Sequence, residues 1–311
     1  MNIGLFFLVI LFVFIIIFYF TWLKNDRSFN SIKNVADSYD DWTNDFLLEG
    51  LWGEHIHLGY YKSLNNQRDF REAKTDFVHE LIHWSGLNKL PSGSRILDIG
   101  CGIGGSARIL SDHYGFDVLG ITISSAQVNR ARQLTPIGLR CRFELMDALD
   151  LQFGEGSFDG IWSVEAGPHM QDKQRYADEM LRVLRPGGVL AVADWNCRES
   201  SEVPLTIVEK IILNQLLNQW THPEFSTING FRNNLLNSAF NGGFVEVEDW
   251  TKFTLPSWND SILEGIRRPQ VIFRLGGNSL LKSLREIPTI LLMRWAFASG
   301  LMQFGVFRSR G

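Results

Sequence analysis

Cysteine is scarce in this chain. Only three cysteines, Cys101, Cys141 and Cys197, occur among 311 residues, and no two of them have C-x-x-C spacing. An odd number of widely spaced thiols excludes a regular disulfide framework and gives no support for a cysteine-based zinc site. The thiols instead indicate a reducing compartment.

An excess of positive charge is also missing. The chain has 30 Lys and Arg against 34 Asp and Glu, a formal net charge of -4. This balance gives no general attraction to polyanions, so we expect no nucleic-acid partner. The chain shows no fixed-period repeat and no low-complexity tract. Its 45% hydrophobic content is enough to bury the core of one large domain, with or without additions.

What the chain does have is a long uncharged run near its N-terminus. Residues 3–23 carry no charge, and a helix rising about 1.5 Å per residue would cross the roughly 30 Å hydrocarbon core of a bilayer with that length. A cleaved signal peptide is the alternative, but a basic n-region and a small-x-small cleavage site are lacking. We predict a transmembrane anchor over residues 1–24. Lys24, Arg27 and Lys33 follow it, which favours the cytoplasmic side for the remaining chain.

Beyond this run the sequence alternates strand and helix patterns, as in an α/β doubly wound fold. The five expected strands cover residues 95–100, 117–124, 141–148, 158–166 and 188–195. Right-handed crossovers between them make the central sheet parallel. A further strand at 244–250 and a last apolar segment at 301–310 fit a mostly parallel sheet with one reversed strand.

Five regions are expected in chain order. The anchor is followed by a cap segment rich in aromatic residues and histidines, an α/β core, a helical insertion that covers the acceptor, and C-terminal strands and basic helices that complete the sheet. These regions cover residues 1–24, 25–93, 94–197, 198–243 and 244–311.

A glycine turn follows the first expected strand. Gly100, Gly102 and Gly105 match the G-x-G-x-x-G of dinucleotide sites, and Gly100, Gly102 and Gly104 equally match the G-x-G-x-G of S-adenosylmethionine (SAM) sites. The glycines alone do not distinguish these two ligands. In open α/β sheets the ligand binds beyond the carboxyl ends of the strands, so the residues there decide between them.

The residues at the strand ends favour SAM. Asp98 precedes Gly100 by two positions, where its carboxylate repels a pyrophosphate and attracts the ammonium group of SAM. A NAD site expects an acidic residue at the end of the second strand, and Thr122 stands there. Asp147, after the third strand, is either an acceptor for the adenine amine or a solvated turn residue. A dinucleotide-dependent oxidoreductase stays as an alternative that measurable NAD(P) binding would support.

The order and spacing of these segments resemble the class I SAM-dependent methyltransferases. "FGEGSFDGIW" at 153–162 and "LRVLRPGGVLAV" at 181–192 complete the resemblance. It implies a Rossmann-like fold with a seven-stranded, mostly parallel sheet, a helical cap and SAM as cofactor. A subset with T-x-S-x-x-Q implies that Thr122 and Gln127 hold the ribose. The residues expected to contact SAM are Tyr39, Asp98, Gly100, Gly102, Gly104, Thr122, Gln127, Asp147, Ala148 and Ser163.

Two candidate catalytic residues follow the fourth expected strand, in "SVEAGPHMQDK". His169 is either a base that also orients a phenol, because its ordinary pKa is near neutrality, or a structural histidine beneath the cap. Glu165 either acts at the methyl position or fixes the cap through a backbone amide. Tyr39 is expected to close over the sulfonium, whose charge suits an aromatic face.

Two further histidines lie close together in the cap segment. His55 and His57 are two positions apart, but no further His/Cys cluster accompanies them and methyl transfer to carbon needs no metal. We therefore expect no metal site.

A narrower resemblance covers nearly the whole chain. "SYDDWTNDFLLEGLWGEHIHLGYY", "GITISSAQVNRA", "WSVEAGPHMQDK" and "REIPTILLMRWAF" are similar to the tocopherol and plastoquinone branch, and most similar to its cyanobacterial 2-methyl-6-prenyl-1,4-benzoquinol methyltransferases. The resemblance implies a prenylated benzoquinol with a phytyl or solanesyl tail as acceptor, and a plasma or thylakoid membrane location. Pro168 favours this step over methylation of γ-tocopherol, where Glu typically stands.

Alternatives remain at this point. One is a methyltransferase for γ-tocopherol or another sterol-like lipid, and the other is a membrane-tethered SAM-binding module without catalysis. From Arg267 to the end, eight basic residues face one acid, Glu286. This region either contacts membrane lipid or forms an ordinary solvated basic face. Protein partners are not indicated.

Overall fold

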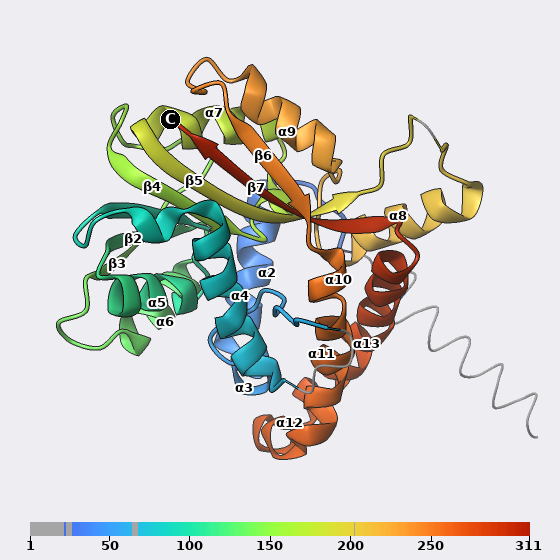
Figure 1. Ribbon diagram of the computed structural model, residues 1–311. Coiled ribbons are helices and arrows are strands. Elements are labelled where there is room, and N and C mark those ends of the chain that lie inside the picture. Colours follow the sequence, from blue (N-terminus) through green and yellow to red (C-terminus); the bar gives the residue numbers. More distant parts are fainter. Residues whose placement is uncertain (1–21, 23–26, 64–67, 202) are drawn as a thin grey trace, which may run out of the picture.

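A seven-stranded sheet forms the centre of the molecule (Figure 1). The computed structural model describes residues 22, 27–63, 68–201 and 203–311. The strands lie in the order β3-β2-β1-β4-β5-β7-β6. They are β1 Arg95–Ile99, β2 Asp117–Thr122, β3 Cys141–Leu145, β4 Phe158–Val164, β5 Leu184–Cys197, β6 Val245–Asp249 and β7 Met302–Arg310. Only β7 runs antiparallel to its neighbours. The predicted Rossmann-like, mostly parallel sheet with one reversed strand is confirmed.

Helices cover both faces of the sheet, which explains why its central strands are almost continuously apolar. On one face, α4, α5 and α6 pack with Phe77, Leu110 and Val128 against the strands, and on the other α7 and α9 pack with Met180 and Leu235. These helices are α4 Phe70–Ser85, α5 Gly105–Tyr114, α6 Ser125–Leu134, α7 Lys173–Val183 and α9 Ile228–Asn237.

The remaining helices form a cap beside the carboxyl ends of the parallel strands (Figure 1). They are α2 Ile32–Asn44, α3 Leu47–Trp52, α8 Ile207–Gln219, α10 Thr251–Thr254, α11 Pro256–Arg267, α12 Pro269–Leu275 and α13 Gly277–Ala298. Of the two short 3₁₀ turns, η3 Gly167–His169 follows β4 on this side, whereas η2 Leu87–Lys89 precedes β1 and packs against α4 and β5. Helix α3 contacts α11 and α12, and α13 contacts α8 and α11. The cap is therefore assembled from segments at both ends of the chain.

Strand β5 begins earlier than the sequence suggests. The expected strand started at Gly188, but β5 already pairs with β4 at Leu184. The register shifts between Phe158 and Gly160, and the Pro186-Gly187 turn is accommodated as a bulge in the strand. Pro186 and Gly187 do form a turn-like irregularity, but the strand continues on both sides of it.

The predicted transmembrane helix is corrected by the structure. Within the described part of the chain, no helix combines the length and apolar character needed to cross a bilayer. The longest helix described there, α13, carries Lys282, Arg285, Glu286 and Arg294 in its 22 residues. The predicted stretch 1–24 lies outside the described residues apart from Trp22. The N-terminal anchor and the membrane-anchored location that depended on it are therefore not retained.

The basic C-terminal region is largely balanced by acids from elsewhere in the chain. Arg267 and Arg268 form ion pairs with Glu264, at 3.1 and 2.6 Å, and Lys282 pairs with Asp45 at 2.7 Å. Arg308 pairs with Glu246 of β6. The charge count from Arg267 onward left these partners out because they precede it, Glu264 within the same helix α11 and Asp45 and Glu246 on segments that pack against the region.

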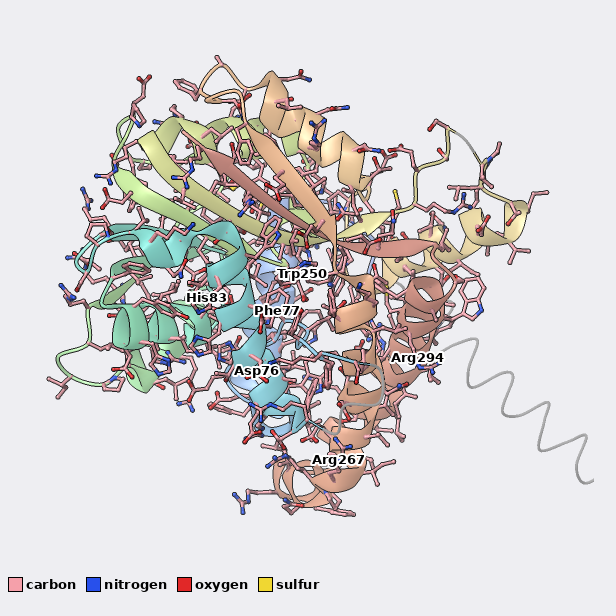
Figure 2. The ribbon with its side chains drawn as sticks, viewed as in Figure 1. Asp76, Phe77, His83, Trp250, Arg267 and Arg294 are labelled. Carbon is pink, nitrogen blue, oxygen red and sulfur yellow. The ribbon has the colours of Figure 1, made fainter. Side chains whose placement is uncertain are left out.

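The reversed strand carries part of the core that joins sheet and cap. Phe304 of β7 is fully buried and lies 5.7 Å, ring centre to ring centre, from Phe77 of α4, which also meets Trp250 (Figure 2). We expect Phe304→Ala to lower the free energy of unfolding by about 3–5 kcal/mol, because it leaves a cavity in this packing.

Urea unfolding checks this value. The control Phe273→Ala removes a ring of α12 that is 79% exposed, and we expect it to change the free energy of unfolding by less than about 0.5 kcal/mol. Equal effects of the two substitutions would contradict the assignment of Phe304 to the core.

Candidate active site

A cavity of about 610 Å³ lies between the carboxyl ends of the parallel strands and the cap. One end is lined by the turn after β1, with Gly100 and Gly102, and the other by α13, with Ile287 and Ile290. This is the place where open α/β sheets bind their ligands. Buried polar and titratable groups gather at the sheet end, and the α13 end combines apolar side chains with Lys282, Arg285 and Glu286 of the same helix.

The glycine turn keeps the floor of the cavity open. Gly100 has φ of 73°, and a Cβ atom there would lie 2.5 Å from the Cβ of Ala166. Gly102 faces open space, so a ligand can approach its backbone directly. Gly104 caps the N-terminus of α5 and does not line the cavity. Of the three glycines, Gly104 therefore has a structural role at the start of α5, and Gly100 and Gly102 line the cavity.

Asp98 is the buried carboxylate at the cavity floor. It is 2% exposed, and its Oδ2 atom has no hydrogen-bond partner among the described residues. Burial raises its pKa to about 7. A buried acceptor without a partner requires a donor from a ligand, and the ammonium group of SAM is such a donor. The site thus fits the cofactor that the sequence predicts.

Thr122 and Gln127 form a buried pair at the end of β2. The Thr122 hydroxyl donates to Oε1 of Gln127 at 2.7 Å, and both residues line the cavity. The neighbouring Ser124 hydroxyl donates to Asp40 of α2 at 2.5 Å, and Asp40 also accepts from the amide of Ala126 at 3.0 Å. The sequence analysis missed Asp40, which fastens the cap to this edge.

The end of β3 places Asp147 and Ala148 in the cavity wall. Asp147 accepts a hydrogen bond from the Leu149 amide at 2.9 Å. Ser163 of β4 is not brought to the cavity. It is fully buried, and its hydroxyl is bonded to the Ile99 carbonyl and the Tyr176 hydroxyl. Because side chains alternate along a strand, Ser163 points to the opposite face from its neighbours, and its expected contact with SAM is dropped.

Tyr39 and His169 form a hydrogen-bonded pair in the cavity wall. The Tyr39 hydroxyl lies 2.8 Å from Nε2 of His169, whereas Nδ1 of His169 has no partner of good geometry among the described residues. Burial, with Lys173 adding to it, lowers the pKa of His169 to about 3. Burial and the charge of Glu165 raise the pKa of Tyr39. In the free protein, therefore, the imidazole is neutral and the phenol is protonated.

Glu165 sits in a strained turn directly after β4. Its φ of 56° is left-handed, which is uncommon for a residue other than glycine. Oε1 accepts a hydrogen bond from the Leu58 amide at 2.7 Å, so Glu165 does hold the cap through a backbone amide. Burial raises its pKa to about 8. Glu165 also lines the cavity. Holding the cap therefore does not remove this residue from the site.

A buried carboxylate fixes the loop that carries these groups. Asp194 of β5 accepts from the Gly167 amide at 3.0 Å, and a Cβ atom on Gly167 would lie only 1.9 Å from Oδ2 of Asp194. Lys173 donates to the carbonyls of Gly167 and Met170 from the other side. The η3 turn is therefore held at its backbone by a carboxylate and an ammonium group.

His55 and His57 hydrogen-bond to each other. The distance from Nδ1 of His55 to Nε2 of His57 is 3.0 Å, and Nδ1 of His57 lies 2.8 Å from the Leu58 carbonyl. Burial lowers the pKa of both rings. Among the residues that the structure describes, no group of three His, Cys, Asp or Glu side chains is placed to hold a metal ion.

The sequence analysis missed an aromatic wall made of Trp195, Trp220, His222 and Trp258. The Trp195 ring centre lies 5.8, 5.7 and 5.5 Å from those of Trp220, His222 and Trp258. Nε1 of Trp220 donates to Glu286 at 2.8 Å, and Glu286 pairs with Arg27 at 2.7 Å. The signal in the sequence was the density of tryptophan, ten in all. It did not reveal that segments far apart in the chain form one wall.

An apolar channel continues the cavity beyond the aromatic wall. Its apolar lining comes from α11, α12 and α13, namely Ile262, Ile266, Ile272, Leu280, Leu284, Ile287 and Ile290. Lys282, Arg285 and Glu286 of α13 line the cavity beside them. Ile266 is 72% exposed and Ile290 only 6%. The channel therefore leads from the buried wall to the surface of the molecule.

Comparison with known proteins gives the family. Residues 97–192 match the family model described as a methyltransferase domain. The chain is 52% identical over 288 residues to the 2-methyl-6-phytyl-1,4-hydroquinone methyltransferase of Synechocystis, covering 93% of this chain and 91% of that protein. It is 29% identical to the chloroplastic tocopherol O-methyltransferase of Arabidopsis thaliana, covering 88% and 80%.

A solved structure with the same fold is the cyclopropane synthase MmaA2 of Mycobacterium tuberculosis. Its TM-score is 0.76 at 18% identity, covering 90% of this chain and 99% of that one. At such identity the likeness concerns the fold alone. The methyltransferase domain and the relatives above confirm an enzyme that uses SAM. The chain belongs to the SAM-dependent methyltransferases, in the family of the 2-methyl-6-phytyl-1,4-hydroquinone methyltransferase.

Proposed function

We propose that this enzyme methylates a ring carbon of a 2-methyl-6-prenyl-1,4-benzoquinol with a phytyl or solanesyl tail, in the supply of tocopherol and plastoquinone. The observation that carries the proposal is the cavity, which joins a polar end at the cofactor loop to an apolar channel on α11 and α13. A quinol head and a prenyl tail have the same polarity in the same order. The name of the Synechocystis relative supports this acceptor.

The cofactor is assigned to the sheet end of the cavity. Asp98 binds the ammonium group, the backbone at Gly100 and Gly102 lies along the methionine part, and Asp147 and Ala148 face the adenine. The Thr122–Gln127 pair holds the ribose. Bound SAM supplies a methyl group on a sulfonium, which needs little activation beyond alignment and exclusion of water.

The acceptor ring dictates which hydroxyl must lose its proton. The two unsubstituted ring carbons of a 2-methyl-6-prenyl-1,4-benzoquinol, at positions 3 and 5, both flank the 4-hydroxyl. Removing the proton of that hydroxyl makes either carbon nucleophilic. The carbon then takes the methyl group, the carbon–sulfur bond breaks, and loss of the ring proton restores aromaticity. The net reaction releases one proton.

His169 is placed as the base for the 4-hydroxyl, and Tyr39 orients it. The open Nδ1 atom accepts the phenolic proton while Nε2 stays bonded to Tyr39. The Thr221 backbone beside the ring favours the protonated form. Glu165 lies near Tyr39, and burial raises the pKa of its carboxyl group to about 8. These groups meet the general need for a positioned base at a buried site.

A methyl-transfer assay tests the proposed function. The full chain is incubated with labelled SAM and either a 2-methyl-6-prenyl-benzoquinol or γ-tocopherol. Label on the ring carbon of the quinol supports the proposal. Label only on γ-tocopherol moves the enzyme to a later step, and retained SAM binding without any transfer would contradict the proposed acceptors.

Replacing the base should separate chemistry from cofactor binding. We expect His169→Ala to lower kcat for the quinol by about 10²–10⁴-fold, the usual contribution of a general base, with SAM affinity unchanged. Rates under saturating SAM, with calorimetry for SAM binding, give the two values. His113→Ala, at an exposed histidine of α5, serves as the control. Joint loss of SAM binding would instead identify His169 as a structural histidine.

Narrowing the apolar channel should weaken acceptor binding alone. We expect Ile287→Trp to raise KM for the quinol about tenfold or more, because overpacking a filled apolar site costs about 1–3 kcal/mol. SAM affinity should not change. Leu291→Trp, one turn further along α13 and 50% exposed, is the matched control. An unchanged KM in Ile287→Trp would show that the tail of the acceptor does not bind in this channel.

Cofactor affinity should depend on pH through Asp98. The carboxyl group has its pKa near 7 and must be ionised to attract the ammonium group. Below that pH it is mostly protonated, so binding of SAM requires loss of its proton. We expect the Kd for SAM to rise as pH falls through about 7, by at most about tenfold per pH unit. Calorimetry across this range measures it. Asp98→Asn should bind more weakly and without this pH dependence, and an unaltered profile in that variant would assign the titration to another group.

A further inference from the structure

We propose that His222 is an acceptor-binding residue whose ring hydrogen-bonds the 1-hydroxyl of the quinol. The inference deepens the proposed function and rests on it. His222 lies in the loop after α8, outside the glycine turn and the strand ends that identify the cofactor site. The geometry of its ring, its missing partners and the substitution pattern of the acceptor all point to this contact.

The His222 ring is buried in the cavity wall without a protein partner. It is 4% exposed, and neither ring nitrogen has a hydrogen bond of good geometry among the described residues, although the Pro168 backbone lies near. A buried imidazole normally satisfies at least one nitrogen, because leaving a polar group desolvated and unpaired is costly. One nitrogen is within reach of the Pro168 backbone, and the other is left for a ligand in the cavity.

A backbone bend directly before His222 places its ring in the cavity wall. Thr221, the residue before it, has a left-handed φ of 57°, a conformation that a β-branched residue rarely adopts. The ring then stacks on His169 at 4.2 Å between ring centres and at 30°. Trp195 and Phe225 hold its other sides at 5.7 and 5.2 Å. The imidazole is thus fixed in orientation by its neighbours, while its edge is left unpaired.

The acceptor presents a hydroxyl in that direction. The 1-hydroxyl stands opposite the 4-hydroxyl and between the methyl group and the tail, so it faces away from the sulfonium and toward the side where the tail leaves. In the cavity this is the side of the aromatic wall, beyond the Tyr39–His169 pair. A hydroxyl enclosed by tryptophan rings needs a hydrogen-bond partner. The buried nitrogens of this wall without a partner of good geometry among the described residues are those of His222 and Nε1 of Trp195 and Trp258, and of these only the His222 ring can accept as well as donate.

Burial, with His169 and Lys173 adding to it, lowers the pKa of His222. The ring is therefore neutral and offers one donor and one acceptor. A neutral ring suits an uncharged hydroxyl, and it places no positive charge beside the sulfonium. The assignment also leaves His169 free to serve the 4-hydroxyl, so the two stacked imidazoles bind opposite ends of the same ring.

A pair of acceptors tests the contact. One is the prenylated quinol, and the other is the phenol with the same methyl group and tail that keeps the 4-hydroxyl and lacks the 1-hydroxyl. We expect the wild-type enzyme to prefer the quinol at least about tenfold in kcat/KM, because the phenol leaves His222 unpaired. In His222→Phe, which keeps a stacked ring without nitrogens, the preference should fall to about one.

Two controls keep the result interpretable. His113→Phe should retain the wild-type preference, and His222→Gln, which keeps a donor and an acceptor, should restore part of it. SAM affinity, measured in parallel, should stay unchanged. An undiminished preference in His222→Phe would overturn the inference. If His222→Phe does not fold, His222→Leu, which also lacks a hydrogen-bonding group, takes its place, and an undiminished preference there would overturn the inference in the same way.

A different result would bear on the proposed function itself. If the wild-type enzyme binds SAM and transfers no methyl group to the quinol, the acceptor is wrong, and the contact with His222 falls with it. If the wild-type enzyme methylates both acceptors equally, the acceptor stands and only the contact is overturned.

Discussion

The hydrogen bond from the Gly167 amide to the buried carboxylate of Asp194 is the contact on which the active site depends. It fixes the chain directly after β4, and the close approach leaves no room for a side chain at position 167. Lys173 ties the same turn from the other side through backbone carbonyls. Because both groups are removed from water, each is costly without the other, and the turn has one stable arrangement.

Several parts of the site follow from that arrangement. Glu165 precedes the fixed turn and accepts from Leu58, so the cap is joined to the loop of the sheet. His169 ends the turn and meets Tyr39 of α2, a second connection to the cap. The polar groups of the site therefore also hold the two layers of the molecule together. Their chemistry and their structural role rest on the same hydrogen bonds.

The sheet and the cofactor end of the cavity were predictable from the sequence because they depend on local patterns. Apolar runs separated by turns gave the strands, and the glycine turn with Asp98 gave the place and charge of the cofactor site. The resemblance to a subset with T-x-S-x-x-Q named Thr122 and Gln127 together, and the two side chains are hydrogen-bonded to each other. These features do not depend on how the cap packs against the sheet.

The remaining features depend on how distant segments pack. Ser163 lies at the right place along β4, but strand alternation turns it toward the other face. Asp40, Trp220 and His222 reach the site only because α2 and the loop after α8 come together over the sheet. The uncharged run before residue 24 suggested a membrane helix by composition alone, and no described helix has that character. The composition of a segment limits the environments that suit it, and tertiary packing decides which residues it contacts.

The open end of the apolar channel has a consequence for how the enzyme measures its acceptor. Its inner wall, at Ile290, is closely packed, whereas its outer wall, at Ile266, is largely in contact with the surroundings. A side chain can discriminate only against atoms that touch it. Among the residues that the structure describes, those near Ile290 therefore enclose a bound apolar chain, and those near Ile266 leave it largely uncovered. A channel of this shape discriminates more at its inner end than at its mouth.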